Sequence, residues 1–370
     1  MPFTSLMIRV VTRGRKSPGK SKAWAVMPSM RIPVSRLVAS KSITNVSAKA
    51  TTESWLNDFA AALASRDASR LAALFADECH WRDILAFTWD LHTTSGADPI
   101  AKRLASALSQ VTPRDLQLAP GRTPPRAVTR AGTPAIEAIF TFQTEVGPCN
   151  GVVRLVSNGS KPRAWTLMTS LDEIRGNEDP ANGRRWQNVD WKRNFGGENW
   201  ADRRRSAAAY ADRDPTVLVV GAAQAGLMTA ARLSMLGVDT LAIDREQRLG
   251  DSWRRRYHAL TLHNETRVNH FPYMPFPRSW PVFIPKDMLA NWFEIYAEAL
   301  ELNVWTGTEL AGATYDDTAR RWTARLKRSD GTERVMHPRH IVFCNGVSTI
   351  PKWPDLPGLK DFAGTVRHSG

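Results

Sequence analysis

Thr216-Val-Leu-Val-Val220, followed directly by Gly221-Ala-Ala-Gln-Ala-Gly226, is the stretch that decides the fold of the second half of this chain. Its first five residues are mostly β-branched, which predicts a strand buried on both faces of a parallel sheet. Residues 227–236 then have a helical pattern, and residues 238–243 predict a second strand that Asp244 closes. This order of strand, glycine-rich turn, helix, strand and acidic residue is typical of a dinucleotide-binding fold.

The positions of this pattern have separate physical roles. Gly221 permits the tight turn from strand to helix, and Gly226 lets the helix lie close to the sheet. The free N–H groups at the start of the helix, together with its dipole, are expected to receive a pyrophosphate. Asp244 is placed to accept hydrogen bonds from a ribose hydroxyl. Ala223 stands where a second glycine is usual, which predicts weaker binding of the phosphates.

Further elements of the same half extend the pattern. Gly250-Asp-Ser-Trp253, Phe271-Pro-Tyr-Met-Pro-Phe-Pro277 and Phe362-Ala-Gly-Thr-Val-Arg-His368 follow in that order. Over residues 216–370 the combination resembles the flavin-containing monooxygenases. The first element is similar to a Gly-Gly-x-Trp element that lies against the flavin in this family, and the third fits its FxGxxxH signature. Val342-Phe-Cys-Asn-Gly346 stands in place of the family's Ala-Thr-Gly, and only its last residue matches.

The resemblance implies a flavin-dependent oxidoreductase that uses FAD and NADPH to transfer an oxygen atom from O2 to a small organic substrate. N- or S-oxygenation, or similar chemistry, is expected, and no catalytic residue is assigned. Because the sequence contains no second glycine-rich turn for NADPH, a truncated chain is expected. An inactive or fragmentary flavin-binding protein stays open as the alternative. The expected cofactor-binding residues are Gly221, Ala223, Gln224, Ala225, Gly226, Asp244, Arg245, Gly250, Trp253 and Gly346.

The first folded unit is expected at residues 53–174. Apolar residues at i, i+4, i+7 and i+8 from Trp55 predict one helix. Asp67 is expected to cap a second helix that extends to Phe75. The strands predicted after these helices cover residues 138–144, 151–156 and 164–170. Helices followed by paired strands indicate an α+β unit.

The order of these elements and the stretch Cys79-His-Trp-Arg-Asp83 resemble the NTF2-like (SnoaL-like) cone fold. Some cones of this kind are enzymes, which makes His80 and Asp83 candidates for residues in a cavity. The other interpretation is that both residues are structural and the unit serves as an association or ligand-binding module, with a homodimer formed through it. The expected fold class is therefore α/β, with a Rossmann-like FAD-binding domain preceded by an α+β NTF2-like domain.

Two segments are not expected to form domains. Residues 1–50 contain ten basic residues and no acidic ones, so we expect a disordered leader, with organellar targeting as the alternative. Residues 175–215 are rich in Asn, Gly, Arg, Asp and Trp and predict a linker. The leader supplies most of the net charge of +14, and it lacks interleaved aromatic residues, so a nucleic-acid partner is not expected.

The cysteines and the hydropathy pattern argue against a metal site and a membrane-spanning helix. Cys79, Cys149 and Cys344 form no CxxC pair, so no zinc site or other metal site is expected. They favour a reducing compartment, and a cytoplasmic location is expected. The sequence contains no apolar run of the length that an integral membrane helix needs. The expected partner is a small-molecule substrate.

Overall fold

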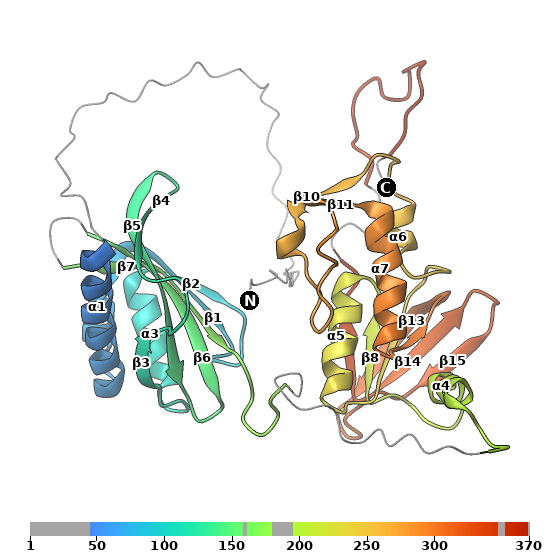
Figure 1. Cartoon of the computed structure of the whole chain (residues 1–370), viewed down its shortest axis with the longest axis horizontal. Coiled ribbons are helices and arrows are strands. Elements are labelled where there is room, and N and C mark those ends of the chain that lie inside the picture. Colours follow the sequence, from blue (N-terminus) through green and yellow to red (C-terminus); the bar gives the residue numbers. More distant parts are fainter. Residues whose placement is uncertain (1–44, 158–160, 180–194, 347–351, 369–370) are drawn as a thin grey trace. The chain divides into compact units, whose positions relative to one another are not determined.

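The computed structural model describes residues 45–157, 161–179, 195–346 and 352–368 (Figure 1). Most of the expected leader and the middle of the expected linker therefore lie outside the described residues. The chain divides into two compact units, with the boundary between Glu178 and Asp179. We call them the N-terminal unit and the C-terminal unit and describe each by itself.

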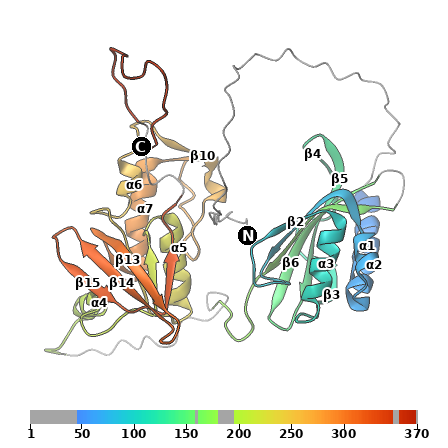
Figure 2. The ribbon, with the colours of Figure 1, turned by 180° about the vertical axis from the view of Figure 1, so that it is seen from behind.

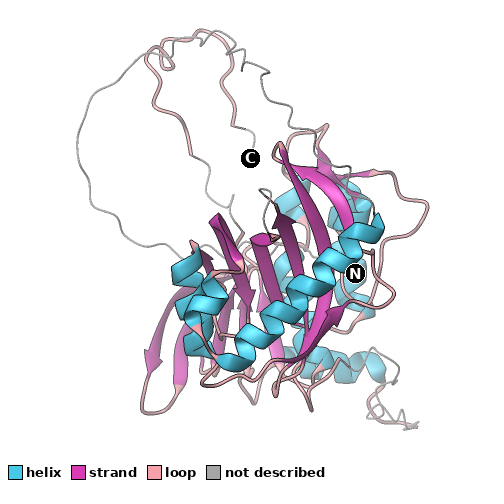
Figure 3. Ribbon diagram, turned by 90° about the vertical axis from the view of Figure 1, so that its left-hand side faces the viewer, coloured by secondary structure: helices cyan, strands magenta, loops and turns pink. Residues whose placement is uncertain are grey.

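The N-terminal unit is a seven-stranded sheet with helices on one face. Its strands run in the order β2-β1-β7-β6-β5-β3, with β4 beside β5, and only β1 and β7 pair in parallel. The helix α1 crosses the strands in Figure 3. The elements are α1 (Asn45–Ser65), α2 (Ala68–Ala72), β1 (Phe75–Ile84), β2 (Thr93–Ser95), α3 (Ala97–Ala107), β3 (Arg114–Leu118), β4 (Arg126–Arg130), β5 (Thr133–Gln143), β6 (Pro148–Val156) and β7 (Arg163–Leu171).

Aromatic side chains fill the space between these helices and the sheet. Trp55 and Phe59 of α1 stack with ring centroids 4.9 Å apart. On the sheet side, Phe87 lies 5.8 Å from Trp81 and 5.5 Å from Phe142. All five residues are almost completely buried. The face of the sheet that the helices cover is therefore a packed core.

The helix α1 begins at Asn45, inside the segment expected to be leader, and it buries Ala48. The prediction that folding starts at residue 53 was therefore too late. Asp67 caps α2 as expected, because its carboxylate accepts hydrogen bonds from the N–H groups of two α2 residues. The helix ends at Ala72, however, and Phe75 opens β1, so the predicted extent of this helix was wrong. The three predicted strands are confirmed as β5, β6 and β7.

The C-terminal unit has three layers (Figure 1, Figure 2). A parallel four-stranded sheet, in the order β12-β9-β8-β16, lies between helices and an antiparallel sheet in the order β13-β14-β15. The elements are α4 (Trp200–Ala209), β8 (Val217–Val220), α5 (Gln224–Met235), β9 (Thr240–Ile243), α6 (Asp251–Arg254), β10 (Thr261–Glu265), η1 (Thr266–Val268), β11 (Phe283–Pro285), α7 (Lys286–Ala299), β12 (Asn303–Trp305), β13 (Thr308–Asp316), β14 (Arg321–Arg328), β15 (Glu333–Met336) and β16 (His340–Phe343).

The unbroken apolar run of β8 follows from these layers. Val217 and Val219 pack into the core under α5 and α7, whereas Leu218 and Val220 pack with residues of the antiparallel sheet. Both faces are covered, so alternation with polar residues is not needed. The predicted strands and helix are confirmed as β8, α5 and β9. The strands β9 and then β12 follow β8 on one side of the sheet, whereas β16 pairs with β8 on the other side. The direction of strand addition therefore reverses between β8 and β16, which is the topological switch point.

Part of the expected linker is folded. The helix α4 has a capping box at Asn199, and the Trp200 indole N–H donates to Glu301 over 2.7 Å. Tyr210 is fully buried, with its ring centroid 6.2 Å from that of Trp305. The linker prediction, 175–215, was therefore too long, because contacts distant in the sequence hold its second part. None of the described helices is long and apolar enough to cross a membrane.

Candidate functional site

The glycine-rich turn lies at the carboxyl end of β8, next to the end of β16. Gly221 has a φ of +100°, and a Cβ atom placed on it would lie 2.7 Å from the carbonyl oxygen of Cys344. The N–H of Cys344 donates to the carbonyl of Val220 over 2.7 Å, so β16 holds this approach in place. Both the backbone angle and the lack of space require glycine here.

The second expected glycine fixes the start of α5. A Cβ atom on Gly226 would lie 1.8 Å from the carbonyl oxygen of Gly221. The first turn of α5 therefore packs directly on the turn that precedes it, and no side chain fits between them. The structure thus gives Gly221 and Gly226 the roles in shaping the turn that the sequence predicted.

The N–H groups at the start of α5 keep their capacity to bind a ligand. Ala223 is the N-cap and its side chain makes no capping hydrogen bond, and the first helical bond runs from Leu227 N–H to Ala223 C=O. Among the described residues, no acceptor faces the N–H groups of Gln224, Ala225 and Gly226. Free N–H groups at the positive end of a helix dipole bind anions, and the phosphates of FAD fit this arrangement.

Ala223 causes no strain in the turn. Its φ of −90° and ψ of −159° belong to extended backbone, which alanine adopts as readily as glycine. Its methyl group is partly buried against the core under α5 and α7. Alanine at this position is therefore compatible with the shape of the turn, and weaker phosphate binding stays a prediction.

Asp244 at the end of β9 joins two loops of the site. Its Oδ2 accepts a hydrogen bond from the N–H of Ala222 over 2.9 Å, and its Oδ1 accepts one from Glu246 over the same distance. An ionised carboxylate has about four acceptor positions, so two stay available for ribose hydroxyls. Asp244 therefore holds the glycine-rich turn as well as standing beside it, a role that its sequence position did not reveal.

The other predicted residues surround this turn less closely. Gly250 has a φ of +86°, and a Cβ on it would lie 2.5 Å from the carbonyl oxygen of Ala290, so α6 lies against α7. Trp253 in α6 is half-buried and packs on the same core as α5. Arg245 is exposed, with its Nε 3.8 Å from a carboxylate oxygen of Glu246.

The sequence at the end of β16 differs from the family's Ala-Thr-Gly, but the backbone of β16 still lies close to the glycine-rich turn. The carbonyl of Cys344, rather than its side chain, faces Gly221, so the identity of this residue leaves the contact intact. Burial raises the pKa of the Cys344 thiol, which keeps it protonated and unreactive at neutral pH. Gly346 has a φ of +75°, is exposed, and has open space around the position of a Cβ.

His80 and Asp83 do not form a joint site. Asp83 is buried and accepts hydrogen bonds from the hydroxyl of Thr169 at 2.6 Å, from the N–H and hydroxyl of Thr88 at 2.7 and 2.9 Å, and from Phe87 N–H at 3.1 Å. His80 is exposed on the opposite face of β1, with Nδ1 2.8 Å from Ser95 Oγ. Side chains alternate along a strand, so three positions separate them onto opposite faces. The two candidates therefore do not face one common cavity.

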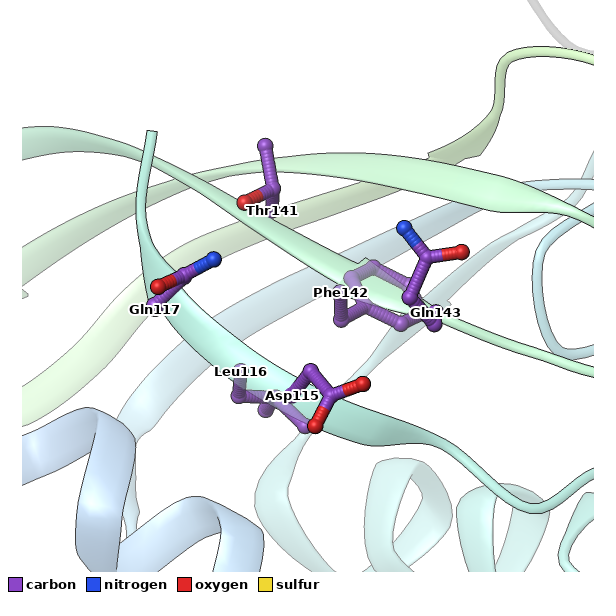
Figure 4. Close-up of a pocket in the computed structure, with 6 residues that line it drawn as sticks. All are labelled: Asp115, Leu116, Gln117, Thr141, Phe142 and Gln143. Carbon is purple, nitrogen blue, oxygen red and sulfur yellow. The ribbon is translucent and has the colours of Figure 1, made fainter. Parts of the chain in front are cut away.

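None of the residues discussed above as site candidates lines either of two concavities found on the described surface. One of about 370 Å³ lies between β3 and β5, where Thr141 and Gln143 project to one side of β5 and Phe142 to the other (Figure 4). Another, of about 430 Å³, lies between α4 and α7. In the described part of the chain, no group of three or more His, Cys, Asp or Glu side chains could hold a metal ion.

Comparison with known proteins gives matches to the C-terminal unit. Residues 214–267 match the family model described as "FAD binding domain". The indole-3-pyruvate monooxygenase YUCCA1 of Oryza sativa subsp. japonica is 35% identical over 156 residues, which are 42% of this chain and 37% of that protein. Monooxygenase aurF of Gibberella zeae is 31% identical over 166 residues, 42% of this chain and 32% of that protein.

Solved structures are similar over a comparable share of the chain. A flavin-containing monooxygenase from Stenotrophomonas maltophilia is 22% identical, with a TM-score of 0.36, over 41% of this chain and 44% of that chain. The complex of OTEMO with FAD and NADP is 19% identical, with a TM-score of 0.35, over 41% of this chain and 30% of that chain. The chain thus spans about a third of the length of the curated relatives named above.

Proposed function

We propose that the C-terminal unit binds FAD and that the chain takes part in the reaction of a flavin-dependent monooxygenase. The observation that carries this proposal is the turn between β8 and α5. Gly221 and Gly226 have no room for a side chain, and the N–H groups of residues 224–226 have no acceptor among the described residues. The match of residues 214–267 to an FAD-binding domain supports the choice of FAD among dinucleotides.

The residues of the site have different tasks in this proposal. The start of α5 holds the pyrophosphate, and Asp244 accepts hydrogen bonds from the ribose while it keeps Ala222 in place. Trp253, which packs beside the core of the unit, would lie against the flavin, as its similarity to the family's Gly-Gly-x-Trp element implies. Arg245, Gly250 and Gly346 complete the set of residues that we assign to cofactor binding.

Bound FAD would supply the redox chemistry, which is the acceptance of electrons from NADPH and the reaction with O2 that oxygenates a small organic molecule. The protein would orient the cofactor and exclude water from it. Burial raises the pKa of the Cys344 thiol, which disfavours the thiolate that a nucleophile needs. The relatives named above are monooxygenases, which supports the reaction type, and the substrate class stays open.

For the N-terminal unit we propose an NTF2-like fold that acts as an association module. Its packed aromatic core and the fully bonded Asp83 favour a structural role over catalysis in a cavity. A homodimer through this unit is part of the proposal. A cytoplasmic location is also proposed, and the three cysteines, all free thiols, agree with a reducing compartment.

The experiment that tests the proposal is an absorption spectrum of the purified chain with FAD, to which NADPH is added without oxygen. A bound flavin spectrum that NADPH bleaches and that O2 restores is the expected result. A flavin spectrum that NADPH leaves unchanged would contradict the monooxygenase function and favour the alternative, a flavin-binding protein without activity.

A further inference from the structure

The outer face of the N-terminal sheet, which is the face turned away from the helices, has an excess of positive charge at β4, β5 and β6. Arg126, Arg130 and Arg154 surround the single carboxylate of Glu137. Its Oε1 accepts hydrogen bonds from Arg126 at 3.0 Å and Arg130 at 2.9 Å, and its Oε2 accepts one from Arg154 at 2.9 Å. Three cations around one anion leave two positive charges uncompensated within this cluster.

The carboxylate of the cluster is ionised at neutral pH. Burial of Glu137 would raise its pKa, but the hydrogen bonds from Arg130, Arg126 and Arg154 outweigh burial and hold the pKa at about 2. Arg126 and Arg154 each donate one of their five N–H groups to Glu137, and the others have no acceptor among the described residues. Half of the Arg126 side chain is exposed to solvent, so these donors are accessible.

The register of the sheet extends the cluster toward His80. Arg154 in β6 lies beside Thr166 in β7, and Thr166 lies beside His80 in β1. The hydroxyl of Thr166 makes no hydrogen bond within the described part of the chain. Ser95 Oγ lies 2.8 Å from Nδ1 of His80, which leaves Nε2 available on the same row. Neighbouring strands lie about 4.8 Å apart, so Thr166 lies one strand away from Arg154, whereas His80 lies two strands away.

We propose that this arginine row, defined as Arg126, Arg130, Arg154 and Thr166, binds the phosphate group of a small organic phosphate. A phosphate dianion compensates the two excess charges, whereas a single carboxylate compensates only one. Guanidinium groups bind phosphate oxygens in pairs of parallel hydrogen bonds, and the hydroxyl of Thr166 adds a neutral donor. This site is separate from the glycine-rich turn and does not depend on the proposed flavin function.

The test is a titration of inorganic phosphate into the full chain at constant ionic strength, followed by the line width of the ³¹P resonance. Saturating FAD is present, so that the start of α5 does not contribute. We expect saturable binding that weakens about tenfold in Arg154→Gln, because one charge-assisted contact is lost. The matched control is Arg163→Gln, since Arg163 pairs with Asp77 and lies outside the row; its binding should equal that of the wild type.

Two further variants leave Glu137 and its arginines in place. Thr166→Val should weaken phosphate binding about threefold, as expected for one neutral hydrogen bond, without unfolding the unit. His80→Ala, two strands from Arg154, should leave the affinity unchanged. Phenyl phosphate should displace the inorganic ion. Absence of saturable binding to the wild type would overturn the proposal. So would equal affinity in Arg154→Gln and the wild type, because the arginines would then only stabilise the sheet. Failure of phenyl phosphate to compete would overturn the assignment to an organic phosphate.

Discussion

The glycine-rich turn of the C-terminal unit and the Asp83 network of the N-terminal unit differ in what they leave unbonded. At the turn, the N–H groups of Gln224 and Ala225 have no acceptor among the described residues, and glycines keep side chains out of the space beside them. Asp83, by contrast, accepts bonds from Thr169, Thr88 and Phe87. A carboxylate with this many donors stabilises the fold and has little capacity for a ligand.

A short polar stretch and a glycine pattern are therefore different kinds of signal. The stretch from Cys79 to Asp83 looked like a site because it carried titratable side chains. The turn looked like one because its glycines removed side chains around free backbone groups. Only the second feature leaves binding capacity in the folded protein, and the following predictions test this difference.

Gly226→Ala should have the largest effect. The new Cβ would meet the Gly221 carbonyl oxygen at 1.8 Å, so α5 must shift as a whole. We expect a loss of about 3 kcal/mol or more in the free energy of unfolding, measured by urea denaturation, and loss of FAD binding. The control is Gly331→Ala, where φ is +85° but no atom lies within 4 Å. It should cost about 1 kcal/mol, from backbone strain alone. Equal costs for both variants would contradict the close packing of the turn.

Asp83→Ala should destabilise the N-terminal unit by about 3 kcal/mol without changing FAD affinity. The substitution leaves the buried N–H groups of Phe87 and Thr88 without their acceptor. Urea denaturation and a flavin titration measure the two quantities. His80→Ala, an exposed position on the same strand, should change stability by less than about 0.5 kcal/mol. If Asp83→Ala is as stable as the wild type, the hydrogen bonds of this carboxylate do not stabilise the fold.

Acid should weaken the N-terminal unit through Glu137. Its pKa is held at about 2 in the folded protein, below the ordinary value of 4.5, so its contribution is present above pH 4.5 and is lost as the pH falls toward 2. The shift corresponds to a loss on the order of 2 to 3 kcal/mol over this range. Denaturation at pH values between 6 and 2 should show a smaller loss for Glu137→Gln. If both proteins lose stability in parallel, this ion cluster does not stabilise the folded state.

Asp244→Ala should have the smallest effect on stability and a clear effect on the cofactor. Loss of the bonds to Ala222 and Glu246 should cost about 1 kcal/mol, and FAD affinity should fall about tenfold. Fluorescence titration with FAD measures the affinity, and Asp317→Ala on the exposed turn after β13 is the control. Unchanged affinity would exclude Asp244 from the cofactor site.

The βαβ element could be predicted because its signals are local. The apolar composition of residues 216–220 predicts that this strand is buried on both faces. The spacing from Gly221 to Asp244 predicts that the loops after the two strands meet at the same edge of the sheet. The carbonyl of Cys344 could not be foreseen, because it reaches Gly221 only after β16 pairs with β8. The folding of Tyr210 against Trp305 likewise depends on a contact distant in the sequence.

The N-terminal unit was predictable in its later strands and its Asp67 cap, and less so in the placement of polar residues. Asp83 accepts a hydrogen bond from Thr169, which is 86 positions away in the sequence. No local sequence pattern predicts this partner. The arginines around Glu137 come from β4 and β6, the two neighbours of its own strand β5, so their charges gather only through the register of the sheet. Sequence periodicity gives the face of a side chain, whereas bonding partners follow from tertiary structure.

The central claim is that the backbone of the glycine-rich turn binds FAD. The most direct measurement is a fluorescence titration of FAD with the wild-type chain and with Gly221→Ala, in which a Cβ would lie 2.7 Å from the Cys344 carbonyl oxygen. We expect saturable binding to the wild type that is lost in the variant, while circular dichroism shows that the N-terminal unit stays folded. Absence of saturable binding to the wild type, or the same affinity in Gly221→Ala, would contradict the claim.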